Sequence, residues 1–360
     1  MSFLIKIFKE LCPPIIYKII SRIYLRIYKS HYKTNEIKHI NDDAFKLYAK
    51  SFGDKNPDKN FYVIRGFGAG MFSNLQYVLA NLRQAELLNM IPVVDFENFN
   101  TIYNEPYPVN NTNNAWEYFF SQTSGYSLKD VYQSKNVFFN TGKYNWDMGY
   151  YFSDKDLFFY YKKYIKFNPD IIKEYNDYKE KLFGNKRILG VHFRGWEMNT
   201  APGHPFCPTE KQMIKLIDMI LDKYSIDSIF LVTEQQEYYE SLTKKYGNKI
   251  LTTPYYRTKQ KIDGYYISPE PRKNHLYLLG KDIIRDALLL SDCIGLLHCN
   301  TNVSTFSRFI NQGKYEFEYS IDNGINSDDP FVAKYLYNIK KRLPSKLGGL
   351  KGEIHFIERK

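Results

Sequence analysis

The sequence predicts an α/β protein with two Rossmann-like domains that face each other across a cleft, preceded by an amphipathic helix. A strand, a glycine-rich loop, a helix and a second strand follow one another between residues 61 and 95. Apolar strands and helices then alternate from residue 187 to a helix that starts near residue 303. Such alternation is typical of parallel sheets, whose strands need crossover helices. The length of 360 residues suits two domains of ordinary size.

Composition divides the chain into five segments. We expect a basic amphipathic segment (1–33), a polar connector (34–58), a first domain (59–184), a second domain (185–320) and a tail (321–360). The domain boundary falls at Gly184-Asn185, a pair typical of a turn. The tail contains one expected helix, residues 331–342, which we predict packs back on the first domain.

The glycine-rich loop joins the strand 61–64 to the helix 72–89. Gly66, Gly68 and Gly70 let the backbone approach a ligand closely, and N–H groups at a helix start attract an anion. The spacing is G-x-G-x-G, whereas dinucleotide-binding loops carry G-x-G-x-x-G, and no Gly-Lys-Ser/Thr closes it as in a Walker loop. The next strand, 91–95, ends in Asp95.

The second domain opens with a buried strand that ends in His192-Phe193-Arg194-Gly195. Alternation puts His192 and Arg194 on the same face of the strand end. The carboxyl end of a parallel strand borders the crevice in which open α/β sheets bind ligands, and Arg holds phosphate with a two-pronged fork. We therefore predict a phosphate-handling crevice here. In the alternative interpretation, Arg194 makes a strand-end salt bridge and His192 is a hydrogen-bonded core histidine.

Polar residues close two more strands of this domain. Thr233-Glu234 follows the strand 229–232, and Asn302, Ser304 and Thr305 follow the strand 293–297, where a helix start would meet a phosphate. Asp286 lies on the helix before that strand. No Asp-x-Asp motif follows any of these strands to chelate a metal on a sugar nucleotide. Positive charge for a diphosphate would then come from Arg194 and N–H groups.

The net charge of +11 favours an anionic partner. The bases gather in residues 1–33, which carry seven Lys or Arg and one acid, so a nucleic-acid partner is not expected. Residues 15–28 have the pattern of a helix with basic and isoleucine-rich faces, and no run is long or apolar enough to cross a bilayer. We expect this helix to lie on an anionic cytoplasmic membrane face, the alternative being a helix docked on the protein itself.

The four cysteines show no CxxC spacing. They sit in or near apolar runs, so we expect reduced, buried thiols of a cytoplasmic protein and no zinc site.

Three blocks of the sequence carry a family resemblance in their order and spacing: residues 66–70, 192–194, and 286–291 with 302–307. On these blocks the chain, from about residue 60 to 312, resembles the inverting fucosyltransferases of the GT-B type, especially the nodulation-type α1,6 enzymes and the protein O-fucosyltransferases. The resemblance implies a GDP-sugar donor, commonly GDP-fucose, held mainly by the second domain without a metal or other cofactor. The first domain would face the acceptor.

The resemblance also implies roles for single residues. Arg194 would grip the β-phosphate, His192 would line the donor site, and Asp286 would approach the guanine or ribose. The diphosphate would be held by the helix start that contains Asn302, Ser304, Thr305 and Phe306, and the loop with Gly66, Gly68 and Gly70 would close over the sugar. Where the family often has a second Arg and then an acid, this chain has Gly195 and Glu197.

The general base is open among three carboxylates, Glu197, Asp95 and, less favoured, Glu105. The predicted activity is transfer of a sugar, most often fucose in this family, from a GDP-sugar to a hydroxyl of a bacterial surface glycan such as lipopolysaccharide or capsule. The basic N-terminus suits a lipid-linked acceptor and a location at the inner face of the cytoplasmic membrane. The alternative is a non-catalytic GDP-sugar or glycan-binding protein that kept the fold.

Overall fold

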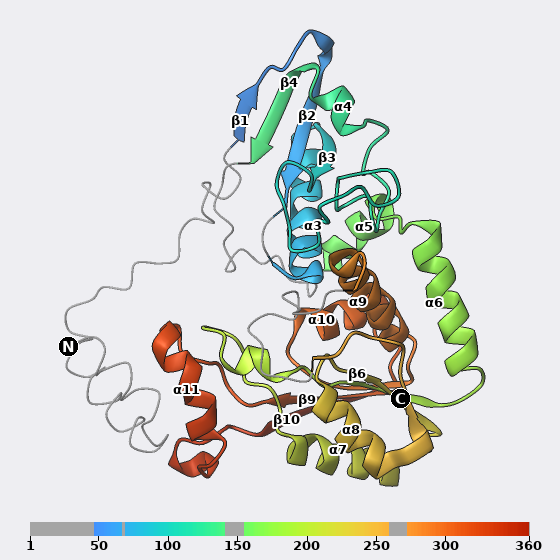
Figure 1. The fold of residues 1–360 in the computed structure, drawn as a ribbon, viewed down its shortest axis with the longest axis vertical. Coiled ribbons are helices and arrows are strands. Elements are labelled where there is room, and N and C mark those ends of the chain that lie inside the picture. Colours follow the sequence, from blue (N-terminus) through green and yellow to red (C-terminus); the bar gives the residue numbers. More distant parts are fainter. Residues whose placement is uncertain (1–46, 67–68, 141–154, 259–271, 360) are drawn as a thin grey trace, which may run out of the picture.

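The computed structural model describes residues 47–66, 69–140, 155–258 and 272–359. They form two α/β domains, each built on a mainly parallel sheet, which confirms the predicted fold class (Figure 1). The expected helix of residues 15–28 lies outside the described residues.

The first domain holds a four-stranded sheet in the order β1-β4-β2-β3. Strands β2, β3 and β4 are parallel, and β1 pairs antiparallel with β4 at the edge. Its elements are β1 (Leu47–Lys50), β2 (Lys55–Arg65), α3 (Met71–Leu87), β3 (Ile91–Asp95), α4 (Leu128–Val131), β4 (Ser134–Asn140) and α5 (Lys155–Tyr164). The stretch expected to be a connector therefore contributes β1 and the first residues of β2.

Helix α6 (Pro169–Leu182) leads into the second domain and packs along α9. This domain holds a six-stranded sheet in the order β10-β9-β8-β5-β6-β7. Its elements are β5 (Ile188–His192), α7 (Glu210–Lys223), β6 (Ser228–Val232), α8 (Gln236–Tyr246), β7 (Ile250–Leu251), α9 (His275–Ser291), β8 (Gly295–Cys299), α10 (Asn302–Asn311), β9 (Phe317–Asp322), α11 (Pro330–Lys340) and β10 (Glu353–Glu358).

The strand order of the second domain locates a ligand crevice. Counted from β5 along the chain, the spatial order is 3-2-1-4-5-6, which is that of dinucleotide-binding Rossmann domains. The order reverses between β5 and β8, which pair in parallel with Leu189 opposite Gly295. Ligands of such sheets bind outside the carboxyl ends of the strands at this reversal. The residues that follow β5 and β8 are therefore expected to border the ligand-binding site.

Helix α3 joins the two domains because it is buried almost all around, polar side chains such as Asn74 and Asn81 included. Most of its residues are buried, which is expected of a helix that has no solvent face. It contacts β2, β3 and α5 of its own domain and α9 and α10 of the other. Phe72 of α3 stacks on Phe306 of α10 with ring centroids 4.2 Å apart. The two domains consequently share one apolar core at their junction.

The tail packs on the second domain, not on the first as expected. Strand β10 pairs antiparallel with β9 at the edge of the larger sheet. Helix α11 buries Leu336 against Phe206 and Leu350 of the same half of the molecule. The reason is that β9 leaves an open sheet edge that the last strand covers, which brings the preceding helix to that domain (Figure 1).

Candidate functional site

Arg194 lies just beyond the carboxyl end of β5, at the strand reversal. Its Nη1 is 2.5 Å from Oε1 of Glu234, which follows β6, and the two side chains are 18% and 8% exposed. The same carboxylate oxygen accepts the Gly195 N–H at 2.8 Å. The strand-end salt bridge considered for Arg194 is therefore present. Because Arg194 keeps part of its surface exposed, the ion pair leaves a cation at the edge of the crevice.

Gly195 stands where the fucosyltransferases that the sequence resembles often have an arginine, and the structure gives a reason for the glycine. A Cβ atom at this position would lie 2.8 Å from Oε1 of Glu234. Any larger residue would push the carboxylate away from Arg194. The glycine at position 195 therefore goes together with Glu234, which the sequence did not identify as the partner of Arg194.

His192 ends β5 and is only 1% exposed. Its Nδ1 shares a hydrogen bond of 3.2 Å with Oγ1 of Thr301, the residue that caps α10. Burial, and then the nearby charges of Arg194 and His298, lower the pKa of His192 to about 3. The imidazole is therefore neutral at physiological pH. His192 fixes the start of α10 against β5, as a satisfied core histidine would.

Helix α10 begins directly after β8 with a capping box. Oγ1 of Thr301 accepts the Ser304 N–H at 3.2 Å, and Oγ of Ser304 accepts the Thr301 N–H at 3.3 Å. Ser304 is fully buried and also donates to the carbonyl of Cys299, while Thr305 donates to the carbonyl of Thr301. Both hydroxyls predicted to hold a diphosphate are thus engaged within the helix start.

The backbone at this helix start has capacity left for an anion. The capping box satisfies the N–H groups of Thr301 and Ser304, and among the described residues those of Asn302 and Val303 have no acceptor. The first N–H groups of a helix carry its positive partial charge. An anion at α10 would therefore be bound by the backbone rather than by hydroxyls.

The start of α3 meets the start of α10 across the domain junction. The Asn302 side chain donates to Oγ of Ser73 at 2.6 Å and accepts from Gln76 at 3.0 Å. Gly70 precedes α3, and a Cβ atom there would meet nothing within 4 Å. Two helix N-termini, one from each domain, thus converge beside open space. This convergence concentrates positive partial charge near the end of β5.

The glycines of the first-domain loop differ in whether the surrounding chain leaves room for a side chain. A Cβ atom on Gly66 would lie 2.4 Å from the carbonyl oxygen of Phe99, so the close approach of its own chain demands glycine there. Gly70 has no such constraint. Gly68 lies outside the described residues. Of the two that are described, only Gly70 has the open surroundings that a ligand would need.

Phe306 was predicted to hold the diphosphate, but its side chain is fully buried. It stacks on Phe72, and Asn302, one turn earlier, bonds to α3. An apolar ring in the core cannot contact an anion, so the sequence-based interpretation of this side chain is wrong for the structure as it stands. Phe306 and Asn302 hold the two domains together at the site.

Asp95 was predicted as a candidate general base, yet it is fully buried and its oxygens are saturated. Oδ1 accepts the backbone N–H groups of Glu97 and Asn98, and Oδ2 accepts the Asn98 amide and the Tyr132 hydroxyl. A carboxylate with four donors around it orders the turn after β3 and has no access to a substrate hydroxyl. The prediction for Asp95 is therefore wrong.

The two other carboxylates are placed differently. Glu105 accepts the Tyr277 N–H at 2.9 Å and so anchors the start of α9 across the domain junction. Glu197 lies on the 3-10 turn η2 (Trp196–Asn199) that follows Arg194 and Gly195, and it is partly exposed. Of the three candidates for the base, Glu197 is the one that combines partial exposure with closeness in the chain to the end of β5.

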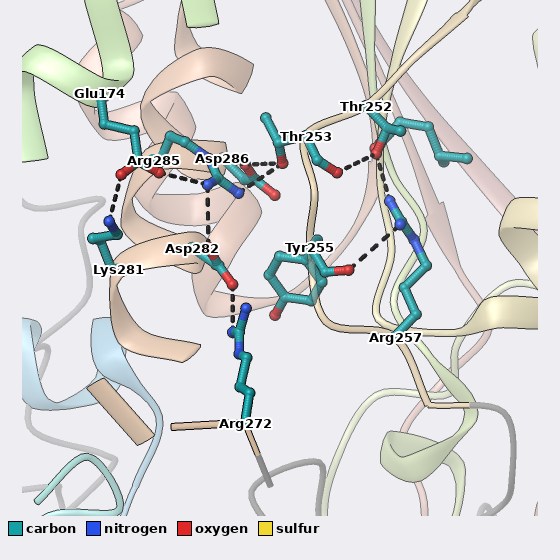
Figure 2. A network of polar contacts seen from close by, with 11 residues as sticks. Glu174, Thr252, Thr253, Tyr255, Arg257, Arg272, Lys281, Asp282, Arg285 and Asp286 are labelled. Atoms are coloured by element: carbon teal, nitrogen blue, oxygen red, sulfur yellow. Dashed lines mark hydrogen bonds and ion pairs between the residues drawn. The ribbon is translucent and has the colours of Figure 1, made fainter. Parts of the chain in front are cut away.

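Asp286 belongs to a buried ionic network centred on Arg285 (Figure 2). Nε of Arg285 is 2.9 Å from Oδ1 of Asp286, and its Nη1 is bonded to Asp282 and Glu174. Oδ1 of Asp286 also accepts the Thr253 hydroxyl at 2.7 Å. Figure 2 shows this network tying α9 to the loop 252–258. Asp286 therefore supports that loop, whatever else it contacts.

The loop 252–258 carries Arg257, which sequence reasoning placed only in a polar loop. Its guanidinium lies 4.4 Å from the centre of the Tyr239 ring and donates to the Thr252 hydroxyl and the Tyr255 carbonyl (Figure 2). Its Nε is buried without a hydrogen-bond acceptor. Burial lowers the pKa of Arg257, and no carboxylate of the described residues forms an ion pair with it. An unsatisfied cationic donor beside β6 is suited to an anionic ligand.

Two cysteines lie beside this site: Cys299 is the last residue of β8, and Sγ of Cys207 donates to the carbonyl of Gly195 at 3.2 Å. Cys207, Cys293 and Cys299 are buried free thiols, as expected. Within the described ranges, one group of side chains has the composition of a metal site, Asp322, Glu353 and His355, and it lies on β9 and β10 rather than at the strand reversal. No described helix is long and apolar enough to span a bilayer.

Comparisons with known proteins agree on a general likeness only. No protein-family model matches the sequence, and no curated protein does. Among solved structures, the fucosyltransferase NodZ from Bradyrhizobium is 13% identical, with 75% of this chain and 99% of that chain covered and a TM-score of 0.49. Arabidopsis thaliana FUT1, in a complex with GDP, is 11% identical over 83% and 77%, with a TM-score of 0.41.

POFUT1 in complex with GDP-fucose is 9% identical over 73% of this chain and 96% of that chain, with a TM-score of 0.42. These are the enzyme types that the sequence blocks resemble.

Proposed function

We propose that this protein is an inverting glycosyltransferase that takes a sugar from a GDP-sugar, with fucose as the favoured sugar. The observation that carries the proposal is the convergence of the α3 and α10 N-termini beside Arg194, at the strand reversal of a Rossmann-ordered sheet. A diphosphate needs concentrated positive charge and N–H donors, and this place supplies both. The choice of a GDP-sugar rests on the three sequence blocks described above.

In this proposal the donor diphosphate accepts the N–H groups of Asn302 and Val303 and contacts the Arg194 guanidinium. Both interactions strengthen as negative charge grows on the departing GDP, which is where stabilisation accelerates the reaction. Arg257 contributes a second cation from the loop 252–258. With these donors the reaction needs no metal ion or other cofactor.

Glu197 is the proposed general base. It would take the proton of the acceptor hydroxyl while the hydroxyl oxygen attacks the anomeric carbon and the bond to GDP breaks, which inverts the configuration. Its position on η2, next to Arg194 and Gly195, keeps the base close to the donor phosphates. Asp95 is not proposed as the base because its carboxylate oxygens already accept hydrogen bonds from the protein.

The acceptor in this proposal is a bacterial surface glycan, possessing a free hydroxyl and carried on a lipid. The basic and isoleucine-rich pattern of residues 15–28 supports a location on the inner face of the cytoplasmic membrane, where such acceptors are assembled. A non-catalytic GDP-sugar-binding protein is the second candidate. The observation in its favour is that Asp95, one of the two leading candidates for the base, is structural.

One assay separates the two candidates. Purified protein is incubated with a panel of nucleotide sugars and with lipid-linked glycan from the source cell envelope, and release of GDP and labelling of the glycan are followed. The proposal predicts turnover with a GDP-sugar and inverted stereochemistry in the product. Tight GDP binding with no transfer to any acceptor would favour the non-catalytic candidate, and no binding of any GDP-sugar would refute both.

A further inference from the structure

The outer face of α11 and the turn after it forms an apolar stripe. Three large side chains on the helix, Phe331, Tyr335 and Ile339, follow at steps of four residues and are 65%, 48% and 42% exposed, and Leu343 and Leu347 in the turn after it are 38% and 56% exposed. Residues four apart lie on one side of a helix. A row of this length is unusual on a soluble surface and marks a place where something apolar docks. We refer to these five residues as the α11 stripe.

The orientation of the stripe is fixed by the opposite side of the helix. Ala333 and Leu336 are buried, and Leu336 packs against Phe206 and Leu350. Asp329 caps the first turn through bonds to two backbone N–H groups. The helix cannot turn its exposed residues inward without exposing this buried side. The stripe therefore faces solvent as a property of the fold, and Figure 1 shows α11 at the periphery of the second domain.

The charged side chains from residue 330 to the end of the stripe are all basic. Lys334, Lys341, Arg342 and Lys346 are exposed, and none of them forms an ion pair within the described part of the chain. The sequence has no Asp or Glu from residue 330 to residue 352. An apolar row flanked by bases is the pattern of a helix that lies in the interface of an anionic bilayer. Each base near such a surface adds to the attraction.

Charge also decides against two other occupants of the stripe. A second copy of this chain, paired symmetrically, would bring the same four bases against one another. The amphipathic segment 15–28 of this chain carries Lys18, Arg22 and Arg26 on one face and would add further positive charge. An anionic lipid surface alone complements both the apolar row and its bases.

We propose that the α11 stripe is a membrane-docking surface of the second domain that inserts into the headgroup region of anionic lipid. This contact is separate from any made by residues 1–33, since α11 belongs to the second domain. It does not depend on the proposed transferase activity. The stripe contains none of the residues assigned to the donor site, so the membrane contact and GDP binding can fail independently.

The charge contribution is tested in the full-length chain by co-sedimentation with vesicles of phosphatidylcholine containing about 30 mol % phosphatidylglycerol. The variant K334E/R342E/K346E is expected to lower the partition coefficient at least about tenfold, since three bases that attract the surface become acids. A matched control, K215E/K244E/K249E, reverses three exposed bases on α7, α8 and the turn after α8. Equal loss in both variants, or no loss in the first, would overturn the proposal.

Insertion of the stripe is tested at the stripe itself. Phe331→Trp places a fluorophore on it, and Phe159→Trp places a control at a side chain of similar exposure, 58%, on α5. With vesicles that carry a spin-labelled acyl chain, fluorescence of the first variant is expected to be quenched and shifted to the blue, and that of the control is not. A blue shift of the first variant without lipid, together with dimer formation, would replace the membrane by a second copy. Absence of quenching would refute insertion.

Discussion

The pairing of Arg194 with Glu234 allows the phosphate role of Arg194 to be tested apart from its structural role. Substituting Arg194 alone would leave a carboxylate that is only 8% exposed without its cation. Breaking a buried pair in this way costs about 3–5 kcal/mol, and the partial exposure of Arg194 puts the expected loss near the lower end. A loss of activity in Arg194→Ala would then mix misfolding with lost binding.

The informative variant is therefore R194Q/E234Q, compared with E234Q. Both remove the ion pair without leaving a buried carboxylate unpaired, and a glutamine at 234 still presents an oxygen to the Gly195 N–H. E234Q retains the Arg194 guanidinium, whose side chain is 18% exposed. We expect E234Q to be the less stable of the two by about 1–3 kcal/mol, because its partly buried guanidinium has lost the carboxylate. They differ in whether a guanidinium faces the crevice.

The magnitude expected for GDP follows from one charge-assisted contact. Such a bond contributes about 1.5–3 kcal/mol, which corresponds to roughly a 10- to 150-fold higher Kd for R194Q/E234Q than for E234Q by isothermal titration calorimetry. E234Q itself should bind GDP at least as tightly as the wild type, because its Arg194 no longer shares its charge with a carboxylate. The surface pair Arg187 and Glu316, 2.6 Å apart, gives the control R187Q/E316Q, which should leave the Kd unchanged. Equal GDP affinity of R194Q/E234Q and E234Q would refute the phosphate role.

Four further results are expected. Glu197→Gln should lower kcat by about 10²–10⁴-fold with little change in KM. Asp95→Asn should instead lower the melting temperature and leave kcat of the folded enzyme nearly unchanged. The opposite pattern would make Asp95 the base and Glu197 the structural residue. The pKa of His192 is about 3 in the folded state and near 6.5 in the unfolded state, so the unfolded chain binds more protons between these two pH values. The contribution of His192 to the free energy of unfolding should therefore fall by about 2 kcal/mol as the pH drops from 6.5 to 5. His192→Asn should flatten that part of the unfolding free energy against pH, and an unchanged slope would contradict a neutral buried His192. Phe306→Ala should destabilise by about 3–5 kcal/mol in chemical denaturation, and a much smaller loss would mean that the Phe72 contact is not part of the folded junction. A chelator should leave turnover unchanged, and recovery of lost activity by added divalent metal would contradict the metal-free diphosphate site.

Buried strands and helices could be predicted from the sequence because their residues form apolar runs that are typical of a buried environment. Strands β2, β3 and β5 and helix α3 were predicted within six residues of their bounds, β3 without error, and the largest difference is the exposed first half of β2. Edge strands carry no such signal. Every residue of β10 is exposed, so nothing local indicates that it pairs with β9 and draws α11 to the second domain.

The position of the candidate site was also predictable, because His192, Arg194 and the polar residues after β8 directly follow apolar strands, whose carboxyl ends border the ligand crevice of such sheets. What could not be read was the partner of each side chain. Glu234 reaches Arg194 from a neighbouring strand, and Phe306 reaches Phe72 from the other domain. Asp95 looked like an accessible acid at a strand end, but the donors that saturate it come partly from Tyr132, far along the chain.

The most direct test of the central claim is a crystal structure of the protein with GDP bound. We predict that the diphosphate accepts the N–H groups of Asn302 and Val303 at the start of α10, next to the start of α3, with the Arg194 guanidinium within hydrogen-bonding distance. Ser304 and Phe306 would remain buried beneath it. A diphosphate bound anywhere else, with the start of α10 and Arg194 left in contact with solvent, would contradict the account.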